Sequence, residues 1–267
     1  MSEEEAPVIS VRALVTRFGE QTVHDGLDFD IRRGEIVGVV GPSGTGKSVL
    51  LREIIGLDRP TEGEINVFGQ NLLAMPEEER DIYERRWGVM FQEGALFSTL
   101  SLMENVAVPM HEHTKLSNEL IDELASLKLM LVGLEPSSFH KRPSQISGGM
   151  RKRAALARAI ALDPELLFLD EPTAGLDPVS AAHFDELIRQ LRDALGLTVF
   201  IVTHDLDTLE AITDRVLVLY EGKVEALGPI AEVRQKARGW VKEYFSGPRG
   251  RAAQAGHAAG IQQGAGA

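Results

Sequence analysis

Hydrophobic positions near the N-terminus fall in two short β-type stretches. The apolar members of the first are Val8, Ile9, Val11, Leu14 and Val15, and those of the second are Phe29 and Ile31. Polar turns separate the two stretches, as in antiparallel strands. The run at residues 35–40, which has no charged residue after Glu35 and is rich in β-branched side chains, then suits a buried strand. The pattern predicts an antiparallel sheet that leads into the first strand of a buried core sheet.

Helical spacing begins soon after that strand, with apolar residues at Val49, Leu50, Ile54 and Ile55. From about residue 76 to residue 161 the pattern is mostly helical, with acidic, leucine-rich stretches such as residues 118–131. We therefore expect an inserted helical subdomain over about residues 93–160.

Strand-like runs return at residues 165–170 and 198–202, and each follows a helix-like segment. Such alternation is typical of a parallel sheet covered by helices. Residues 216–220 and 223–226, joined by Glu221 and Gly222, predict a hairpin. The chain as a whole is therefore expected to have an α/β fold.

The segment after Pro229 carries a single apolar stripe at helical spacing, formed by Ile230, Val233, Ala237, Val241 and Tyr244. The stripe predicts one final amphipathic helix that runs to about Phe245. It is either part of the core or a partner contact, and we favour the core because a single stripe usually faces its own domain. The domain would span residues 1–246, followed by a disordered tail at residues 247–267 that is rich in glycine, alanine and glutamine.

Composition narrows the class of protein. A chain of 267 residues forms one large domain or two small ones, and its net charge of −12 argues against a broad nucleic-acid-binding surface. No apolar run approaches the roughly 20 residues that span a bilayer, and the first residues lack the features of a signal peptide, so we expect a cytoplasmic location. The sequence has no cysteine, so a metal would need oxygen or histidine ligands.

A phosphate-binding loop follows the expected strand at residues 35–40. The loop consists of Gly41, Pro42, Ser43, Gly44, Thr45, Gly46, Lys47 and Ser48. Its glycines let successive N–H groups turn inward toward a polyanion, and phosphate would then lie at a helix N-terminus. Lys47 would reach the β- and γ-phosphates, and the Ser48 hydroxyl would bind Mg²⁺. The match in a strand, loop and helix context predicts a nucleoside triphosphate site.

Two carboxylates end the apolar run at residues 166–169. In open α/β sheets, ligands bind at the carboxyl ends of the strands, so Asp170 would hold the Mg²⁺ shell and Glu171 would be the general base for water. The alternative interpretation is that Asp170, Glu171 and Pro172 simply cap the next segment.

A second glycine-opened helix begins at Ser147, Gly148 and Gly149. Free N–H groups at such a helix end, together with the Ser147 hydroxyl, suit a γ-phosphate held from the opposite side. Ser147 would also serve as an ordinary N-cap, and the two roles are compatible.

Together these residues resemble the ATP-binding cassette family, whose motifs occur here in the family's order over about residues 8–245. The resemblance implies a P-loop NTPase fold with an antiparallel lead-in sheet, a RecA-like parallel core and a helical subdomain. It assigns the remaining motifs as Gln92 in the Q-loop, residues 147–149 in the signature, Asp177 in the D-loop at residues 174–177, His204 as the switch histidine and Phe18 as the adenine-stacking aromatic. The alternative for Phe18 is a core residue, because the family often uses tyrosine at this position and a lone phenylalanine is often buried.

One position departs from the family pattern, because Met150 replaces the usual signature glutamine. Residues 91–114 and 147–162 are similar to the ATPase subunits of Mla-type phospholipid transporters. That resemblance implies ATP and Mg²⁺ as ligands, with Ser48, Gln92 and Asp170 around the metal, and a head-to-tail homodimer that closes around two ATP molecules. It also implies an integral membrane permease, a STAS-domain regulator and a periplasmic lipid-binding subunit as partners, at the cytoplasmic face of the inner membrane.

Two other functions share the core motifs. One is the ATPase of an importer for a polar solute such as an amino acid. The other is a soluble cassette protein that acts on DNA or ribosomes, but such proteins typically fuse two cassettes or carry long coiled coils, which this chain lacks. We therefore expect lipid transport and no nucleic-acid partner.

Overall fold

The structure is a computed structural model that describes residues 6–71 and 74–247. The described chain divides into two compact units, one formed by the residues up to 71 and from 202 onward, the other by residues 74–201. The predicted tail at residues 247–267 lies outside the described residues, except for Gly247.

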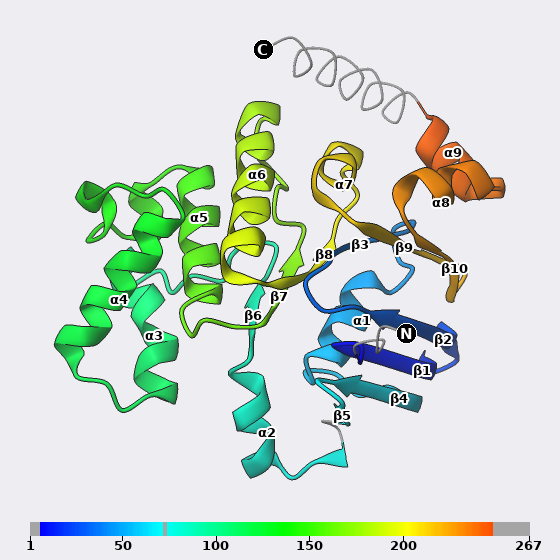
Figure 1. The fold of residues 1–267 in the computed structure, drawn as a ribbon, viewed down its shortest axis with the longest axis horizontal. Coiled ribbons are helices and arrows are strands. Elements are labelled where there is room, and N and C mark those ends of the chain that lie inside the picture. Colours follow the sequence, from blue (N-terminus) through cyan, green and yellow to red (C-terminus); the bar gives the residue numbers. More distant parts are fainter. Residues whose placement is uncertain (1–5, 72–73, 248–267) are drawn as a thin grey trace, which may run out of the picture. The chain divides into compact units, whose positions relative to one another are not determined.

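An antiparallel sheet forms the first part of the first unit, with strand order β2-β1-β4-β5 (Figure 1). Its strands are β1 (Ile9–Phe18), β2 (Gln21–Ile31), β4 (Glu62–Val67) and β5 (Gln70–Asn71). β1 pairs with both β2 and β4, and its Ile9, Val11, Leu14 and Val15 side chains are buried, as expected for a sheet with one face on the core. The predicted lead-in sheet is therefore confirmed.

Three further strands belong to the first unit: β3 (Ile36–Val40), β9 (Arg215–Tyr220) and β10 (Lys223–Gly228). β9 runs parallel to β3 and antiparallel to β10, so the predicted hairpin is confirmed. All five residues of β3 are buried. Helices α1 (Lys47–Ile54) and α7 (Leu206–Ile212) complete this region.

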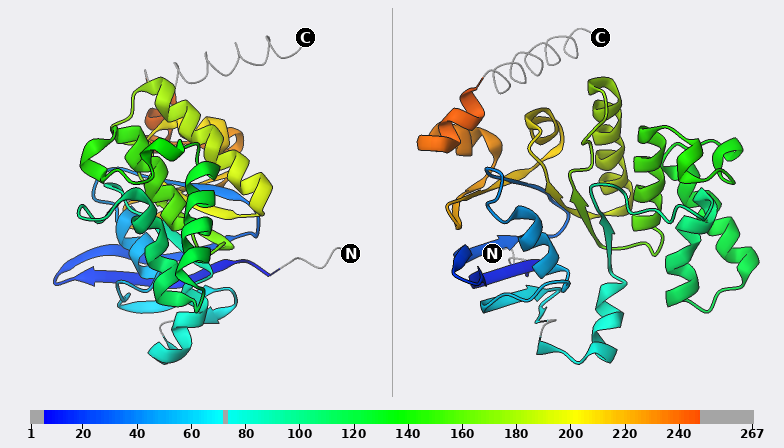
Figure 2. Two further views of the ribbon diagram at one scale, coloured as in Figure 1. Left: turned by 90° about the vertical axis from the view of Figure 1, so that its left-hand side faces the viewer. Right: turned by 180° about the vertical axis from the view of Figure 1, so that it is seen from behind.

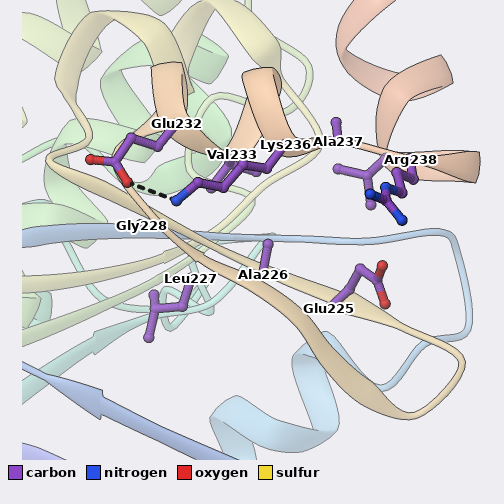
Figure 3. A pocket seen from close by; sticks show the side chains of 10 residues that line it. Glu225, Ala226, Leu227, Gly228, Glu232, Val233, Lys236, Ala237 and Arg238 are labelled. Carbon is purple, nitrogen blue, oxygen red and sulfur yellow. Dashed lines mark hydrogen bonds and ion pairs between the residues drawn. The ribbon is translucent and has the colours of Figure 1, made fainter.

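Two helices, not one, follow Pro229: α8 (Ile230–Lys236) and α9 (Gly239–Ser246). The predicted continuous helix was wrong because Ala237 has an extended ψ of 135° and Gly239 a positive φ of 51°, which together end the first helix. Core packing was the correct alternative, since Val233, Val241 and Phe245 are buried against β9 and α7 residues. Figure 3 shows α8 above β10, with Glu232 and Lys236 paired at the rim of a cavity of about 270 Å³.

The second unit contains β6 (Trp87–Met90), β7 (Leu166–Asp170) and β8 (Thr198–Val202), with β7 in the middle and β6 parallel to it. It also contains α2 (Glu77–Glu84) and the long α6 (Pro178–Leu195). The stretch at residues 76–161 is mostly helical as expected, but β6 within it was not predicted. Its four residues are too few to show a strand period, so the pattern alone did not reveal it.

Three helices pack together in the second unit: α3 (Leu102–His113), α4 (Asn118–Leu131) and α5 (Gly148–Ala159). Figure 2 shows them side by side in green. Between α4 and α5 lie the short 3₁₀ turns η2 (Pro136–Ser138) and η3 (Pro143–Gln145). Serine residues cap α3, α4 and α5, which explains where each helix begins. The three helices fall inside the range 93–160, whose status as a separate subdomain stays a prediction.

Candidate nucleotide-binding site

The loop at residues 41–48 connects β3 to α1, and the fold itself requires several of its glycines. Gly44 and Gly46 have φ values of +84° and +85°, which favour glycine. A Cβ on Gly41 would lie 2.2 Å from the Leu219 carbonyl oxygen, and a Cβ on Gly46 would lie 2.4 Å from His24 Nε2. Gly46 is the N-cap of α1, no side chain caps this helix, and a helix N-terminus of this kind suits anion binding.

Lys47 lies against the backbone of its own loop. Its Nζ donates to the carbonyl oxygens of Gly41 at 2.8 Å and Pro42 at 2.9 Å, and Thr45 Oγ1 also donates to Pro42 at 2.9 Å. Ser43 lies in the same loop, and Ser48 is the second residue of α1. The loop is thus held in a curled form by its own side chains, with the ammonium group at its centre.

His204 belongs to the same unit as this loop. Its neighbour Thr203 donates its N–H to the Val39 carbonyl oxygen of β3 at 3.2 Å, which holds this segment beside the strand that enters the loop. Asp205 caps α7, and the Tyr244 hydroxyl donates to the His204 carbonyl oxygen at 3.1 Å. The imidazole side chain is exposed.

Phe18 ends β1 and is 55% exposed. The core alternative for this ring therefore does not hold. An exposed ring at the end of a strand suits stacking on a base, and that role stays a prediction.

The second unit holds Asp170 and Glu171 at the end of β7, both half-buried. Glu171 has a φ of +47°, a backbone conformation that non-glycine residues rarely adopt. Its carbonyl oxygen accepts a hydrogen bond from Ala174 N at 3.2 Å and one from Lys152 Nζ at 3.1 Å. These two donors hold the residue in its unusual conformation.

Lys152 of α5 is a site residue that the sequence analysis missed. Its Nζ donates to the carbonyl oxygens of both Gln92 and Glu171, so one buried ammonium joins the signature helix to two predicted catalytic segments. Burial lowers the pKa of Lys152 below its usual 10.5, while the carboxylates of Glu93, Glu171 and Asp170 oppose that shift. Lys152 lies between Arg151 and Arg153, so nothing in the sequence singled it out.

Arg158 makes a second link between α5 and the segment after Gln92. Its guanidinium donates to the carbonyl oxygens of Gly94 at 2.8 Å and Ala95 at 2.7 Å, and burial lowers its pKa. Lys152 and Arg158 therefore hold the backbone at Gln92 and at the two residues 94 and 95.

Ser147 caps α5 by accepting a hydrogen bond from Met150 N at 3.3 Å, so the N-cap interpretation is correct. The next two residues differ from the glycines of the phosphate loop, because a Cβ on Gly148 or Gly149 would meet no atom closer than 3.8 Å. The single chain thus gives no packing reason for either glycine. Gly148 lines a cavity of about 210 Å³, together with Gln92, Lys152 and residues 174–176.

Asp177 ends the D-loop and caps α6. Its Oδ1 accepts from Val179 N at 3.1 Å and Ser180 N at 3.0 Å. Hydrogen bonds from the hydroxyl and the N–H of Ser180 lower the pKa of Asp177 below 3.8. The predicted D-loop residue therefore has a structural role within its own chain.

The described residues contain no group of three or more histidine or acidic side chains that would hold a metal by themselves. The predicted magnesium ligands Ser48, Gln92 and Asp170 are all oxygen donors, which Mg²⁺ prefers, and such sites usually add substrate phosphates and water. The donor chemistry therefore fits Mg²⁺ bound together with a nucleotide.

The profile of the ABC transporter family matches residues 24–174, more than half of the chain. The chain therefore belongs to the ABC transporter family, with the P-loop NTPase fold, and is an ATP-hydrolysing subunit that binds ATP. It is similar to the intermembrane phospholipid transport system ATP-binding protein MlaF of Haemophilus influenzae, with 40% identity over 90% of each chain.

Two further proteins show the range of its relatives. The probable ribonucleotide transport ATP-binding protein mkl of Mycobacterium leprae is 39% identical over 90% of this chain and 69% of that protein. A dimeric ATP-binding cassette, solved in a post-hydrolysis state with ADP and Pi, is 30% identical with a TM-score of 0.76, over 83% of this chain and 98% of that one.

Proposed function

We propose that this ATPase drives the movement of phospholipid between the inner and outer membranes, from the cytoplasmic face of the inner membrane. The observation that carries the proposal is the similarity to the phospholipid transport protein of Haemophilus influenzae, which extends over 90% of both chains. Among the described residues, no helix is both long and apolar enough to cross a membrane.

The roles of the site residues follow from their chemistry. The phosphate loop binds the triphosphate, with Lys47 on the β- and γ-phosphates. Bound Mg²⁺ would neutralise phosphate charge, held by the oxygens of Ser48, Gln92 and Asp170. Glu171 accepts the proton of the attacking water, and His204 donates a hydrogen bond to the γ-phosphate.

A second copy of the chain would complete each ATP site. In this head-to-tail homodimer, Ser147, Gly148 and Gly149 of one copy bind the γ-phosphate held by the loop of the other. The open space around Gly148 and Gly149 supports the proposal, because glycine at both positions suits close approach by a ligand rather than packing within the chain. Loss of several charge-assisted hydrogen bonds on hydrolysis, each worth about 1.5–3 kcal/mol, would reopen the pair.

An integral membrane permease would dock on the second unit. Phe97 is 51% exposed with the Arg158 guanidinium 5.9 Å from its ring centre, and a groove of about 270 Å³ lies between β6, α3 and α5. Pro109, His113 and Arg158 are among its lining residues. A STAS-domain regulator and a periplasmic lipid-binding subunit would belong to the same complex.

Transport of a polar solute is the second candidate function. It is favoured by the similarity to the Mycobacterium leprae protein, which is described as a probable ribonucleotide transport protein. Both candidates use the same ATP chemistry and differ in the permease and its cargo.

Affinity purification of the full chain from a membrane extract in mild detergent distinguishes the two candidates. We expect mass spectrometry to find a permease, a lipid-binding subunit and bound phospholipid. Recovery of a permease with a binding protein for an amino acid or nucleotide would contradict the lipid proposal and favour the second candidate. A Lys47→Ala chain is the matched control, because the substitution lies in the phosphate loop and leaves the proposed docking surface unchanged.

A further inference from the structure

Three buried polar residues lie directly beneath the phosphate loop, in the first unit. Thr16 is on β1, His24 on β2 and Glu53 on α1, and their exposed fractions are 2%, 0% and 1%. Buried polar groups of this kind are costly unless they are hydrogen-bonded to one another. None of the three belongs to the phosphate-loop motif.

The imidazole of His24 joins this cluster to the loop. Its Nδ1 lies 2.9 Å from Thr16 Oγ1 and 3.3 Å from Glu53 Oε2, and Thr16 Oγ1 donates to Glu53 Oε1 at 2.7 Å. On the opposite side of the ring, Nε2 lies 3.2 Å from the carbonyl oxygen of Gly46. Thr16 and Glu53 therefore fix the ring, and the ring contacts the last glycine of the loop.

The proton on Nε2 follows from its partner. A backbone carbonyl oxygen only accepts hydrogen bonds, so Nε2 must carry the proton that it donates to Gly46. The same oxygen also accepts from Leu50 N of α1 at 2.7 Å. Gly46 is thus held by one donor from its own helix and one from β2.

Packing reinforces this contact. A Cβ on Gly46 would lie 2.4 Å from His24 Nε2 and 2.5 Å from a methyl carbon of Val23, so β2 fits closely against the loop at this glycine. The φ of +85° at Gly46 turns the chain into α1, whose first N–H groups are expected to face phosphate. The position of the imidazole therefore controls the direction of those N–H groups.

We propose that His24, held by Thr16 and Glu53, is a positioning residue that preorganises the phosphate loop for nucleotide binding. It acts through the carbonyl oxygen of Gly46 and does not touch the nucleotide. The inference rests on the proposed phosphate-binding role of residues 41–48, which Lys47→Ala tests separately. Preorganisation strengthens binding because less ordering is required when phosphate arrives.

Two double variants separate the hydrogen bond from the burial of charge. Both carry Glu53→Gln, which avoids an unpaired buried carboxylate. In the first, His24→Gln keeps an N–H that reaches toward Gly46, and in the second, His24→Leu has none. We expect the full-length double variant with His24→Leu to bind a fluorescent ADP analogue about three- to tenfold more weakly than the one with His24→Gln. This difference is the usual worth of one hydrogen bond. The KM for ATP should rise by a similar factor while kcat changes by less than about twofold.

The outcomes distinguish positioning from a purely structural role. Equal ADP affinity of the two folded double variants would overturn the proposal. Ile65→Val, a buried change in β4, is the stability control and should lower the melting temperature without altering ADP affinity. Unchanged ADP binding by Lys47→Ala would instead defeat the proposed role of the loop, whatever the His24 variants show.

The wild-type chain provides a test that does not depend on the folding of any variant. Nitrogen NMR of protein labelled at histidine should show a proton on Nε2 of His24, with a resonance that shifts when ADP is added. An unprotonated Nε2 would contradict the hydrogen bond to Gly46 and overturn the proposal.

Discussion

Glu171 combines an expected catalytic role with a backbone conformation that costs free energy. A non-glycine residue with a φ of +47° costs about 1–3 kcal/mol and persists where its surroundings hold it. Here Lys152 and Ala174 both donate to its carbonyl oxygen. Glu171 directly follows a buried strand and its backbone is held by these two hydrogen bonds, which suits a general base that must be precisely placed.

Glu171→Gln should bind ATP normally and slow turnover by about 10²–10⁴-fold, because the amide has the same shape but does not accept the proton of water. The ATP-bound dimer should accumulate on size-exclusion chromatography. Glu165→Gln, at an acidic residue paired with Arg86 just before β7, is the matched control and should hydrolyse ATP at the wild-type rate. Near-normal hydrolysis by Glu171→Gln would exclude it as the base.

Lys152→Met removes the shared donor of Gln92 and Glu171 while keeping most of the side-chain volume. Two backbone acceptors then lose their charged partner, so we expect the free energy of unfolding to fall by about 1–3 kcal/mol and kcat to fall roughly tenfold. Urea unfolding and steady-state ATPase assays measure the two effects. Lys152→Arg should recover part of the rate, and Lys141→Met, at an exposed lysine, should change neither quantity.

At the scale of elements, several motif residues also begin the helices that carry them. Ser147 caps α5, Asp177 caps α6 and Asp205 caps α7. Capping satisfies backbone N–H groups that have no partner within the helix, so these short side chains have a structural role at the helix starts. The structural and functional interpretations of these residues are therefore compatible.

Asp177→Ala should lower the melting temperature by about 2–4 °C, because α6 loses its cap. Asp177→Asn should retain most of the stabilisation by the cap. Hydrogen bonding lowers the folded pKa of Asp177 below 3.8, so its stabilising effect is present above 3.8 and is lost as the pH falls through the folded pKa. The difference between wild type and Asp177→Ala should therefore shrink in strongly acidic buffer. Melting curves at neutral and acidic pH test this, and a difference independent of pH would contradict it.

The sequence predicted those elements whose pattern is local and long. The strand at 198–202, the helix at 118–131 and the hairpin after residue 216 all formed as expected. The break between α8 and α9 was missed, because the apolar residues keep their helical spacing through Ala237. The backbone at Ala237 is nevertheless extended, so the helix ends there. Local periodicity reports which face is buried, and it does not report a change of two dihedral angles.

For the site, the sequence predicts residues that form a contiguous motif and misses contacts between distant segments. Residues 41–48 form a contiguous motif, so the sequence alone identified the loop. Lys152 and His24 act through backbone carbonyl oxygens that are distant in sequence, at Gln92, Glu171 and Gly46. No spacing rule joins β2 to the loop or α5 to the Q-loop, so these contacts required the three-dimensional structure.

At the scale of the whole molecule, a single chain holds every motif of the family but is proposed to hold no complete site. The phosphate loop would act with the signature of a second copy, and a head-to-tail pair closes with both sites equivalent. The structure supports this through Gly148 and Gly149, which lack a packing reason within the chain. Single variants tested alone do not probe this arrangement. Two chains that are inactive because of changes in different motifs should complement each other when they are mixed.

Ser147→Arg should abolish hydrolysis while leaving nucleotide binding by the monomer intact, since the arginine would block the partner's site and not its own. Lys47→Ala should abolish hydrolysis by weakening binding at its own loop. A mixture of the two inactive chains forms some dimers in which the intact loop of one chain faces the intact signature of the other, so part of the ATPase activity should return. Each variant assayed alone at the same total concentration is the control. A signature that served its own chain would leave every combination inactive, and that result would refute the head-to-tail arrangement.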